Sequence, residues 1–449
     1  MRAGSRNWVA SLFNTIADSG RDLLARDRNR SDIGALCHDL LSLRGEASGM
    51  AIAREVMQRY ADLDDAARAA FFLMLRDEFG QDREAVLAAA EAYREHDDEE
   101  SMIALAHAVE SPRQELIRRL NMAPHGTEAL VDMRTDLLAC LADDRRLAAV
   151  DNDLRHLLAS WFNRGFLEMR AIDWSTPAET LEKLIAYEAV HEIQGWDDLR
   201  RRLAEDRRCF AFFHPALPDD PLIFVQVALT RGIARSVQTL LEEPVDETAE
   251  AEADTAIFYS ISNCQRGLAG ISFGNFLIKQ VVADLRRELP QIKTFSTLSP
   301  VPGFRRWLAD AVDHDVTPGG VNADMLARID EPGWLDDGDT AAAVETPLRR
   351  ACANYLVHAK RGDQPRDPVA RFHLGNGATL GAVNWRGDVS DKGIAQSASI
   401  MVNYVYDLAT IERNHERLVN TGEVVASSEV EKLAGPGPGS RKAANGKTG

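Results

Sequence analysis

An apolar run, a glycine-bearing turn and an amphipathic helical pattern follow one another directly between residues 256 and 285. The apolar run, Ala256-Ile-Phe-Tyr-Ser-Ile-Ser262, is typical of a buried strand. The turn from Cys264 to Gly274 also contains Gly267 and Gly270, and the helical pattern begins at Asn275. Because the first N–H groups of a helix are unpaired and carry partial positive charge, this order of elements predicts an anion-binding site.

A second apolar run ends in an unusual turn, Thr294-Phe-Ser-Thr-Leu-Ser-Pro-Val-Pro-Gly-Phe304. Ser299 stands directly after this run, and the prolines that follow it stiffen the turn because their φ angles are fixed. Further along, His373 lies in the segment Phe372-His-Leu-Gly-Asn-Gly-Ala378. On residue type alone, a serine before proline is more often a turn cap, and a single histidine before an apolar residue is more often structural.

These segments resemble the malonyl-CoA decarboxylase family, and they occur here in the family's order. The shared motifs are Phe-Tyr-Ser-Ile-Ser, Gln-x-Gly-Leu-x-Gly, Phe-Leu-Ile-Lys, Leu-Ser-Pro-x-Pro-Gly-Phe and Phe-His-Leu-x-Asn-Gly-Ala. The resemblance covers Trp161 to Leu408 well and the N-terminal third only in general character. It implies the decarboxylation of malonyl-CoA to acetyl-CoA and CO2 by a domain of the GNAT-type acyl-CoA fold.

The resemblance also implies roles for individual residues. Ser299 and His373 match the family's catalytic pair, in which the serine holds the malonyl carboxylate or accepts a proton and the histidine donates one. Tyr406 matches a tyrosine near the family's site, and it either donates to the substrate or packs as a strand aromatic. Asn384 and Asp388 are candidates to orient His373. Ser296, near Ser299, is expected to face the other side of its strand.

The glycine-bearing segment is expected, from the same resemblance, to wrap the pyrophosphate of CoA. Its final residue opens the helical pattern, and Ser272 departs from the acidic residue of animal members. The segment consists of Ala269, Gly270, Ile271, Ser272, Phe273, Gly274 and Asn275.

A chain of 449 residues is too long for one ordinary core, so two domains are expected. Residues 1–165 show helical patterns, with Asp65 and Asp82 as opening residues, and predict an all-α bundle. Its apolar stripes and the resemblance to the family together imply that this bundle mediates homo-oligomerisation. Residues 166–434 alternate strand-like and helical patterns and predict an α/β (α+β) GNAT-like catalytic domain, a fold selected by the resemblance. Residues 435–449 begin with Gly-Pro-Gly-Pro-Gly and predict a disordered tail.

The formal net charge of −18 argues against nucleic acid or an anionic membrane as the main partner. A polyanionic ligand such as CoA then needs local positive charge, for which Arg231, Arg266 and Lys279 are candidates. The five cysteines show no Cys-x-x-Cys pair, so we expect no structural metal site and a reducing compartment. No apolar run is long enough to span a membrane. The cytoplasm is therefore the expected location, with the mitochondrial matrix as the less favoured alternative.

Malonyl-CoA is expected to be the substrate and acetyl-CoA the product, without a metal or organic cofactor, because the thioester itself accepts the electron pair. Two other functions stay open on the sequence. The GNAT-type fold also suits an acyltransferase that moves an acyl group from CoA to an amine. A non-catalytic acyl-CoA sensor is the third reading, although the intact Ser299 and His373 motifs argue against it.

Overall fold

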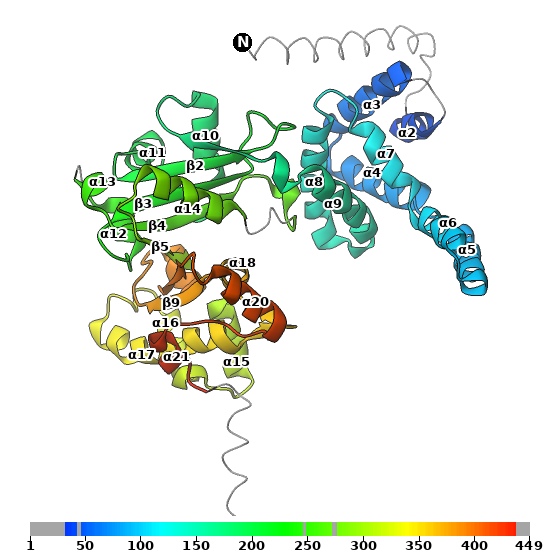
Figure 1. Ribbon diagram of the computed structural model, residues 1–449. Helices are drawn as coiled ribbons and strands as arrows, with labels where there is room; N and C mark the ends of the chain where they lie inside the picture. The colour runs from blue at the N-terminus through cyan, green and yellow to red at the C-terminus, as the bar shows by residue number, and fades with distance from the viewer. Residues whose placement is uncertain (1–31, 43–45, 246–247, 272–275, 437–449) are drawn as a thin grey trace, which may run out of the picture. The chain divides into compact units, whose positions relative to one another are not determined.

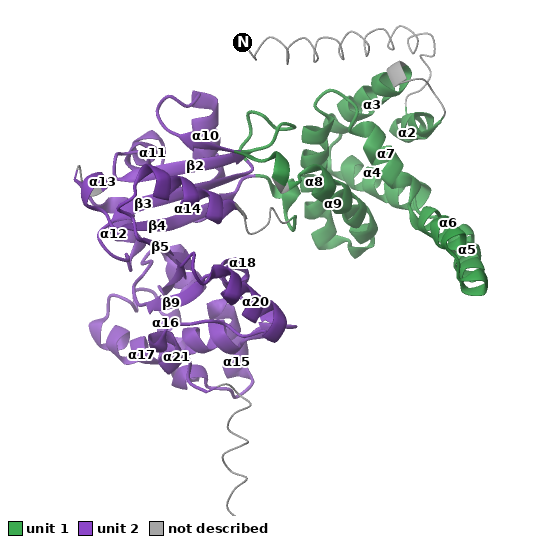
Figure 2. Cartoon of the chain, viewed as in Figure 1, with its two compact units in different colours: residues 1–168, 213–221, 265–273 green, residues 169–212, 222–264, 274–449 purple. Residues whose placement is uncertain are grey.

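The computed structural model describes residues 32–42, 46–245, 248–271 and 276–436. The chain divides into two compact units (Figure 2). Unit 1 consists of residues 1–168, 213–221 and 265–273, and unit 2 of residues 169–212, 222–264 and 274–449. Two short segments that lie far along the chain therefore belong to the helical unit. The expected tail lies outside the described residues from residue 437 onward.

Unit 1 is helical, as its apolar periodicity predicts (Figure 1). The side chain of Asp82 accepts hydrogen bonds from the amides of Glu84 and Ala85, so it caps α5 as expected. At the start of α4 the cap is Asp64, one residue before the expected Asp65. The helices are α2 (Ile33–Leu41), α3 (Glu46–Ala61), α4 (Asp65–Glu78), α5 (Arg83–His96), α6 (Glu99–Val109), α7 (Pro112–Leu120), α8 (Gly126–Asp143), η1 (Arg145–Leu147), α9 (Ala148–Trp161) and η2 (Arg164–Phe166).

The core of unit 1 forms where α2, α3, α4, α7, α8 and α9 bury their apolar stripes together. A buried ion pair crosses this unit, because the guanidinium of Arg113 donates to the carboxylate of Asp153. The Ser111 hydroxyl donates to the same carboxylate at 2.7 Å. Removing either side chain would leave the other charge buried without its partner, which would destabilise the helical unit.

Unit 2 is built on a mixed sheet with the strand order β1-β2-β3-β4-β5-β10-β6, and β9 also pairs with β10. A separate two-stranded ribbon is formed by β7 and β8. The strands are β1 (Glu168–Ile172), β2 (Arg207–Phe213), β3 (Ile223–Thr230), β4 (Thr255–Asn263), β5 (Thr294–Thr297), β6 (Ser299–Pro300), β7 (Lys360–Arg361), β8 (Gln364–Pro365), β9 (Thr379–Asn384) and β10 (Met401–Tyr406).

The helices of unit 2 connect and cover these strands (Figure 1). A short helix, α13, lies between α12 and β4 in an acidic stretch of the chain. The helices are α10 (Ala178–Tyr187), α11 (Trp196–Arg202), α12 (Val237–Glu242), α13 (Ala249–Glu252), η3 (Arg266–Leu268, in unit 1), α14 (Phe276–Glu288), α15 (Phe304–Asp313), η4 (Pro318–Gly320), α16 (Ala323–Asp330), α17 (Gly338–His358), α18 (Pro368–Gly375), α19 (Asp391–Ser397), α20 (Ile411–Thr421) and α21 (Ser428–Ala434).

The centre of the sheet is a parallel pair, β4 and β5, joined through α14, whereas β3–β4 and β5–β10 are antiparallel. The parallel register ends where Phe258 pairs with Thr297. On its other side β4 carries a bulge, because Val227 pairs with Phe258 while Gln226 pairs with Ser260, which leaves Tyr259 as the extra residue. A helical region followed by a domain of helices and a mixed sheet is thus confirmed.

Candidate active site

Three candidate catalytic side chains, distant in sequence, meet in unit 2. Ser299 opens β6, His373 lies in the short helix α18, and Tyr406 ends β10. The Oγ atom of Ser299 is 3.3 Å from Nε2 of His373, and Nδ1 of His373 is 2.8 Å from the hydroxyl oxygen of Tyr406. All three residues are buried. The fold therefore joins them into one hydrogen-bonded series.

Two further residues complete this arrangement, and the sequence reasoning missed both. The Ser299 hydroxyl donates to Oγ1 of Thr297 at 2.8 Å, and the backbone N–H of Tyr404 donates to the same oxygen at 3.2 Å. The ring of Tyr404 stacks on the His373 imidazole, with 4.7 Å between centroids. Side chains two positions apart in an extended chain lie on the same face, and this alternation could have indicated both residues. Thr297 lies two positions before Ser299, and Tyr404 lies two positions before Tyr406.

The direction of these hydrogen bonds follows from the single hydrogen of the Ser299 hydroxyl. Because that hydrogen is directed to Thr297, Ser299 accepts from Nε2–H of His373, and the Tyr406 hydroxyl donates to Nδ1. Burial lowers the pKa of His373 from 6.5 to about 3, and burial raises the pKa of Tyr406 well above its usual value. The imidazole is therefore neutral at pH 7 and presents its Nε2 proton toward Ser299.

In the described part of the chain, neither Asn384 nor Asp388 forms a hydrogen bond with His373. The side-chain amide of Asn384 donates to Oδ1 of Asn403 at 2.7 Å, and Asn403 in turn donates to the backbone oxygen of Thr297. The carboxylate of Asp388 instead accepts from Gln238 and from the Ser390 amide. His373 is oriented by its neighbours on β10, so the proposed orienting role of both residues is wrong, although Asn384 supports the strand that carries Thr297.

The glycine-bearing segment is described only in part. Ala269, Gly270 and Ile271 belong to unit 1, and Gly270 has the left-handed φ of 75° that favours glycine. Buried Arg134 of α8 donates from Nη1 to the backbone oxygens of Gly267 and Ala269, at 2.6 and 2.9 Å. The remaining candidates of this segment, Ser272, Phe273, Gly274 and Asn275, lie outside the described residues.

Gly267, in the turn of the expected anion-binding site, has a packing role within unit 1. A Cβ atom at this position would lie 1.9 Å from the backbone oxygen of Val131 in α8. The glycine therefore allows η3 to lie directly against α8 within unit 1. Two cations expected to attract CoA are already paired, because Lys279 contacts Glu412 and Arg231 contacts Glu252.

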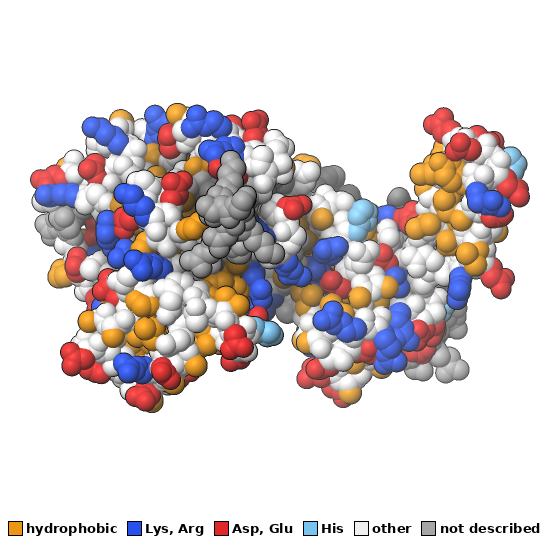
Figure 3. Space-filling view, turned by 90° about the horizontal axis from the view of Figure 1, so that it is seen from below, with side chains coloured by type: hydrophobic (Ala, Val, Ile, Leu, Met, Phe, Trp, Pro, Cys, Tyr) orange, Lys and Arg blue, Asp and Glu red, His pale blue; other side chains and the backbone are white. Residues whose placement is uncertain are grey.

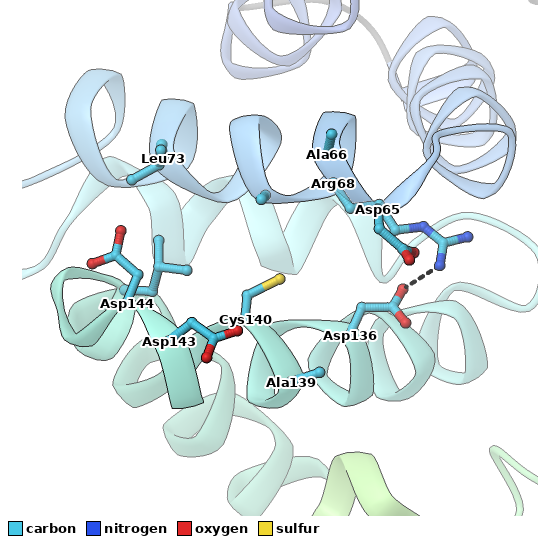
Figure 4. Close-up of a pocket in the computed structure, with 11 residues that line it drawn as sticks. Asp65, Ala66, Arg68, Leu73, Asp136, Ala139, Cys140, Asp143 and Asp144 are labelled. Atoms are coloured by element: carbon cyan, nitrogen blue, oxygen red, sulfur yellow. Dashed lines mark ion pairs between the residues drawn. The ribbon is translucent and has the colours of Figure 1, made fainter.

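Pocket volume does not identify the site. A pocket of about 510 Å³ lies between α4 and α8 in unit 1, and Figure 4 shows the ion pair between Arg68 and Asp136 at its edge. None of the sequence-predicted site residues lines it. A pocket of about 580 Å³ in unit 2 reaches Tyr406, with Arg286 and Lys293 among its lining residues. The convergence of Ser299, His373 and Tyr406 is the stronger evidence for a catalytic site.

Three findings concern metal-binding groups, disulfides and membrane-spanning helices. Within the described ranges, no group of three or more His, Cys, Asp or Glu side chains could hold a metal ion. All five cysteines lie in those ranges and none forms a disulfide. In the same part of the chain, no helix has both the length and the apolar character that crossing a membrane requires.

Fold and site together define a class, that of proteins in which a helical region accompanies a mixed-sheet α/β domain with a buried serine, histidine and tyrosine. Within that class the chain belongs to the malonyl-CoA decarboxylase family. The family model for the "Malonyl-CoA decarboxylase C-terminal domain" matches residues 165–444, and the model for the N-terminal domain matches residues 79–162.

Individual relatives agree with this assignment. The protein named malonyl-CoA decarboxylase, mitochondrial, from Anser anser anser is 36% identical over 84% of this chain and 82% of its own length. The crystal structure of malonyl-CoA decarboxylase from Rhodopseudomonas palustris is similar with a TM-score of 0.85 and 50% identity, covering 89% of this chain and 98% of that one. The Agrobacterium vitis structure has a TM-score of 0.83 and 53% identity, covering 90% and 100%.

Proposed function

We propose that this protein decarboxylates malonyl-CoA to acetyl-CoA and CO2, the activity named in its relatives. The observation that carries the proposal is the buried series from Tyr406 through His373 and Ser299 to Thr297. It places a neutral imidazole with a directed proton beside a serine hydroxyl. Both groups stand in the motifs that distinguish the family.

The thioester arm of the substrate has a natural place along β4. Beyond Phe258 this strand has no strand partner on the β5 side in the described part of the chain, because β5 turns toward β10. An unpaired strand edge offers backbone N–H and C=O groups, and the pantetheine arm of CoA carries two amides that can pair with it. Such pairing would hold the acyl group at the end of β5, where Ser299 follows Thr297.

The chemistry requires one carbon–carbon bond to break and one proton to be delivered. The Ser299 hydroxyl turns its hydrogen from Thr297 to the malonyl carboxylate and holds it, and the bond to carbon 2 breaks as CO2 leaves. The electron pair passes into the thioester carbonyl and gives an enolate. His373 then donates a proton to carbon 2, which completes the methyl group of acetyl-CoA.

The low pKa of His373 is compatible with this role. In the unliganded site the imidazole is neutral, because burial disfavours its charged form. A malonyl carboxylate brought beside it favours the charged form, so His373 takes up a proton as substrate binds. That proton is the one the overall reaction consumes. The thioester serves as the electron acceptor throughout, and we propose that no other cofactor takes part.

Three finer features are part of the proposal. Residues 269–275 bind the pyrophosphate of CoA, and a Gly274→Val variant that folds with unchanged acetyl-CoA affinity by calorimetry would contradict this. The helical unit mediates homo-oligomerisation, and the exposed apolar side chains of the hairpin formed by α5 and α6 support this part of the proposal. The cytoplasm, where thiols stay reduced, suits five cysteines that form no disulfide.

The decisive experiment is incubation of the purified protein with malonyl-CoA and no acyl acceptor. We expect stoichiometric CO2 and acetyl-CoA, with one solvent deuterium in the methyl group when the reaction runs in D2O. An acyltransferase would release neither product without an amine acceptor, and an acyl-CoA sensor would bind without turnover. Absence of CO2 from folded protein that binds malonyl-CoA would therefore refute the proposed reaction.

A further inference from the structure

The part of β4 that follows the bulge is anchored from one side only. Its other edge loses β5 after Phe258, so no strand holds it there in the described part of the chain. The side chains of Ser260 and Ser262 point to the same face, because strand residues two apart do so. Both are buried, and both find the same partner on that face.

That partner is the carboxylate of Glu188, which lies just after α10 and is itself buried. Two of its donors are the amides that follow it in the loop, and the others come from β3 and β4. In the mechanism proposed above, this carboxylate takes no part in bond breaking or proton transfer. Its donors are Val190 N (2.7 Å), His191 N (3.1 Å), Ser260 Oγ (2.7 Å to Oε2), Ser262 Oγ (2.9 Å to Oε1) and Gln226 Nε2.

The same carboxylate also reaches the bulge. The hydroxyl of Tyr259, the extra residue of the bulge, donates to Oε1 of Gln226 at 2.8 Å, and Nε2 of Gln226 donates to Glu188. Tyr259, Ser260 and Ser262 are thus tied to one charged group, directly or through Gln226. Hydrogen bonds to a charged acceptor in a buried site are strong and directional.

The loop that carries Glu188 is itself held in place by hydrogen bonds. The Lys392 ammonium donates to the backbone oxygens of Ala189 and Val190, at 2.6 and 3.0 Å, and Lys392 belongs to α19. The amide of Ala189 also donates to Oγ of Ser262 at 3.3 Å. Glu188 is therefore a rigid support and not a mobile side chain that happens to contact the strand.

From these contacts we propose that Glu188 is a positioning residue, which holds the unpaired edge of β4 from Tyr259 to Asn263 in place for the amides of the acyl-CoA arm. The inference rests on the proposed function, because it assigns that edge to the substrate. Glu188 does not touch the reacting atoms. Its loss is expected to weaken the binding of every acyl-CoA, while Ser299 and His373 keep their geometry.

The test compares Glu188→Gln with Glu192→Gln, the same chemical change at an exposed position four residues later. In Glu188→Gln an amide NH2 replaces one acceptor oxygen and opposes the hydroxyl and amide donors around it. We expect the KM for malonyl-CoA and the Kd for acetyl-CoA to rise about tenfold together, with kcat at saturation within about threefold of wild type. Glu192→Gln should match the wild type in all three.

Hydrogen exchange supplies a readout that a general loss of stability would not produce. Amides of residues 259–263 should exchange faster in Glu188→Gln, while those of β10 keep wild-type protection. The double variant Ser260→Ala with Ser262→Ala removes the two hydroxyl donors of β4 and keeps Glu188, so it tests the contacts between Glu188 and the strand if Glu188→Gln does not fold. We expect it to raise both constants in the same direction.

Two outcomes would overturn the inference. One is an unchanged Kd for acetyl-CoA in folded Glu188→Gln or in the folded double variant. The other is a raised Kd without any change in exchange at residues 259–263. Because acetyl-CoA binding needs no decarboxylation, these results can be told apart from failure of the proposed reaction, in which wild-type protein would release no CO2.

Discussion

At the residue scale the central feature is a serine hydroxyl that accepts from one side and donates to the other. Ser299 accepts from His373 and donates to Thr297, so its oxygen is held in one orientation inside the protein. Ser296, three residues earlier, is equally buried, and its hydroxyl donates to a backbone oxygen of its own strand. The two serines therefore form a matched pair, of which only Ser299 belongs to the hydrogen-bonded series with His373 and Tyr406.

Replacing Ser299 by alanine is expected to lower kcat by up to about 10²–10³, the usual loss when a preorganised hydrogen-bond donor is removed from an active site. Because acetyl-CoA lacks the malonyl carboxylate, its affinity should stay near the wild-type value. Ser296→Ala is the control and should retain most of kcat. The measurements are steady-state kinetics with malonyl-CoA and calorimetry with acetyl-CoA, and equal losses for the two ligands would point to general damage of the site.

The lowered pKa of His373 predicts an unusual pH dependence. Burial holds this pKa at about 3 in the free enzyme, so the imidazole is already neutral throughout about pH 5–8, where an ordinary histidine titrates. We expect no inflection from His373 in kcat/KM over that range. In the complex the substrate raises the pKa, so kcat should fall as pH rises through the new value.

His373→Ala should lower kcat by about 10²–10⁴ and remove the alkaline fall of kcat, with acetyl-CoA affinity unchanged. The pH profiles of kcat and kcat/KM, measured separately on wild type and variant, check both statements. An inflection of wild-type kcat/KM near pH 6.5 that disappears in the variant would show that His373 titrates in the free enzyme, against the structure.

At the scale of elements, the short helix α18 carries the candidate catalytic residue His373. His373 occupies its last turn, and the helix begins at Pro368 after the buried residue Asp367. Oδ1 of Asp367 accepts from the amides of Val369 and Ala370, both at 2.9 Å. Burial raises the pKa of this carboxyl group. One oxygen therefore caps the helix.

Asp367→Ala removes that cap and should destabilise the protein by about 0.5–2 kcal/mol. Because His373 lies on the same short helix, kcat should fall more than acetyl-CoA affinity. Asp367→Asn keeps an acceptor at the cap and removes the buried charge, so it should restore most of both stability and kcat. Thermal melting and steady-state kinetics on the two variants test this, and an asparagine variant as damaged as the alanine variant would contradict the capping role.

At the scale of the whole molecule, one part of unit 1 has no core of its own. Helix α5 contains no buried residue, and together with α6 it forms a hairpin on which Figure 3 shows hydrophobic side chains gathered at the right of the view. The hairpin tip, residues 97–100, is entirely acidic, and Arg83 begins α5 at the opposite end. Leu87, Met102 and Ile103 are about half exposed or more, at 60%, 49% and 51%.

A second copy of the same hairpin in antiparallel orientation would cover this apolar face as in a four-helix bundle and bring each acidic tip toward the other copy's Arg83. Replacing Leu87 and Ile103 together by glutamate should therefore lower the oligomer mass in light scattering. Val419→Glu, a change at another exposed apolar position in α20, is the control and should leave the mass unchanged. A wild-type protein that is monomeric at micromolar concentration would refute self-association.

The sequence by itself determined the elements and the candidate side chains. Helical periodicity, N-cap residues such as Asp82 and apolar strand runs are local properties, so they could be read without the fold. Ser299 and His373 were found because their motifs match a family, and Tyr406 because it occupies a matching strand position. Nothing local to these three residues shows that they meet.

Only the tertiary structure decided which groups contact one another. Thr297 joins the site because the β5–β10 register brings it beside Tyr404, and a shift of one residue would turn both side chains to the other face. The two serines of the Phe-Tyr-Ser-Ile-Ser strand donate hydrogen bonds to Glu188, more than 70 residues away in sequence, because a bulge at Tyr259 sets the face of the strand on which they lie. Such contacts depend on register and on chain segments that are distant in sequence, and residue patterns within one segment carry no information about either.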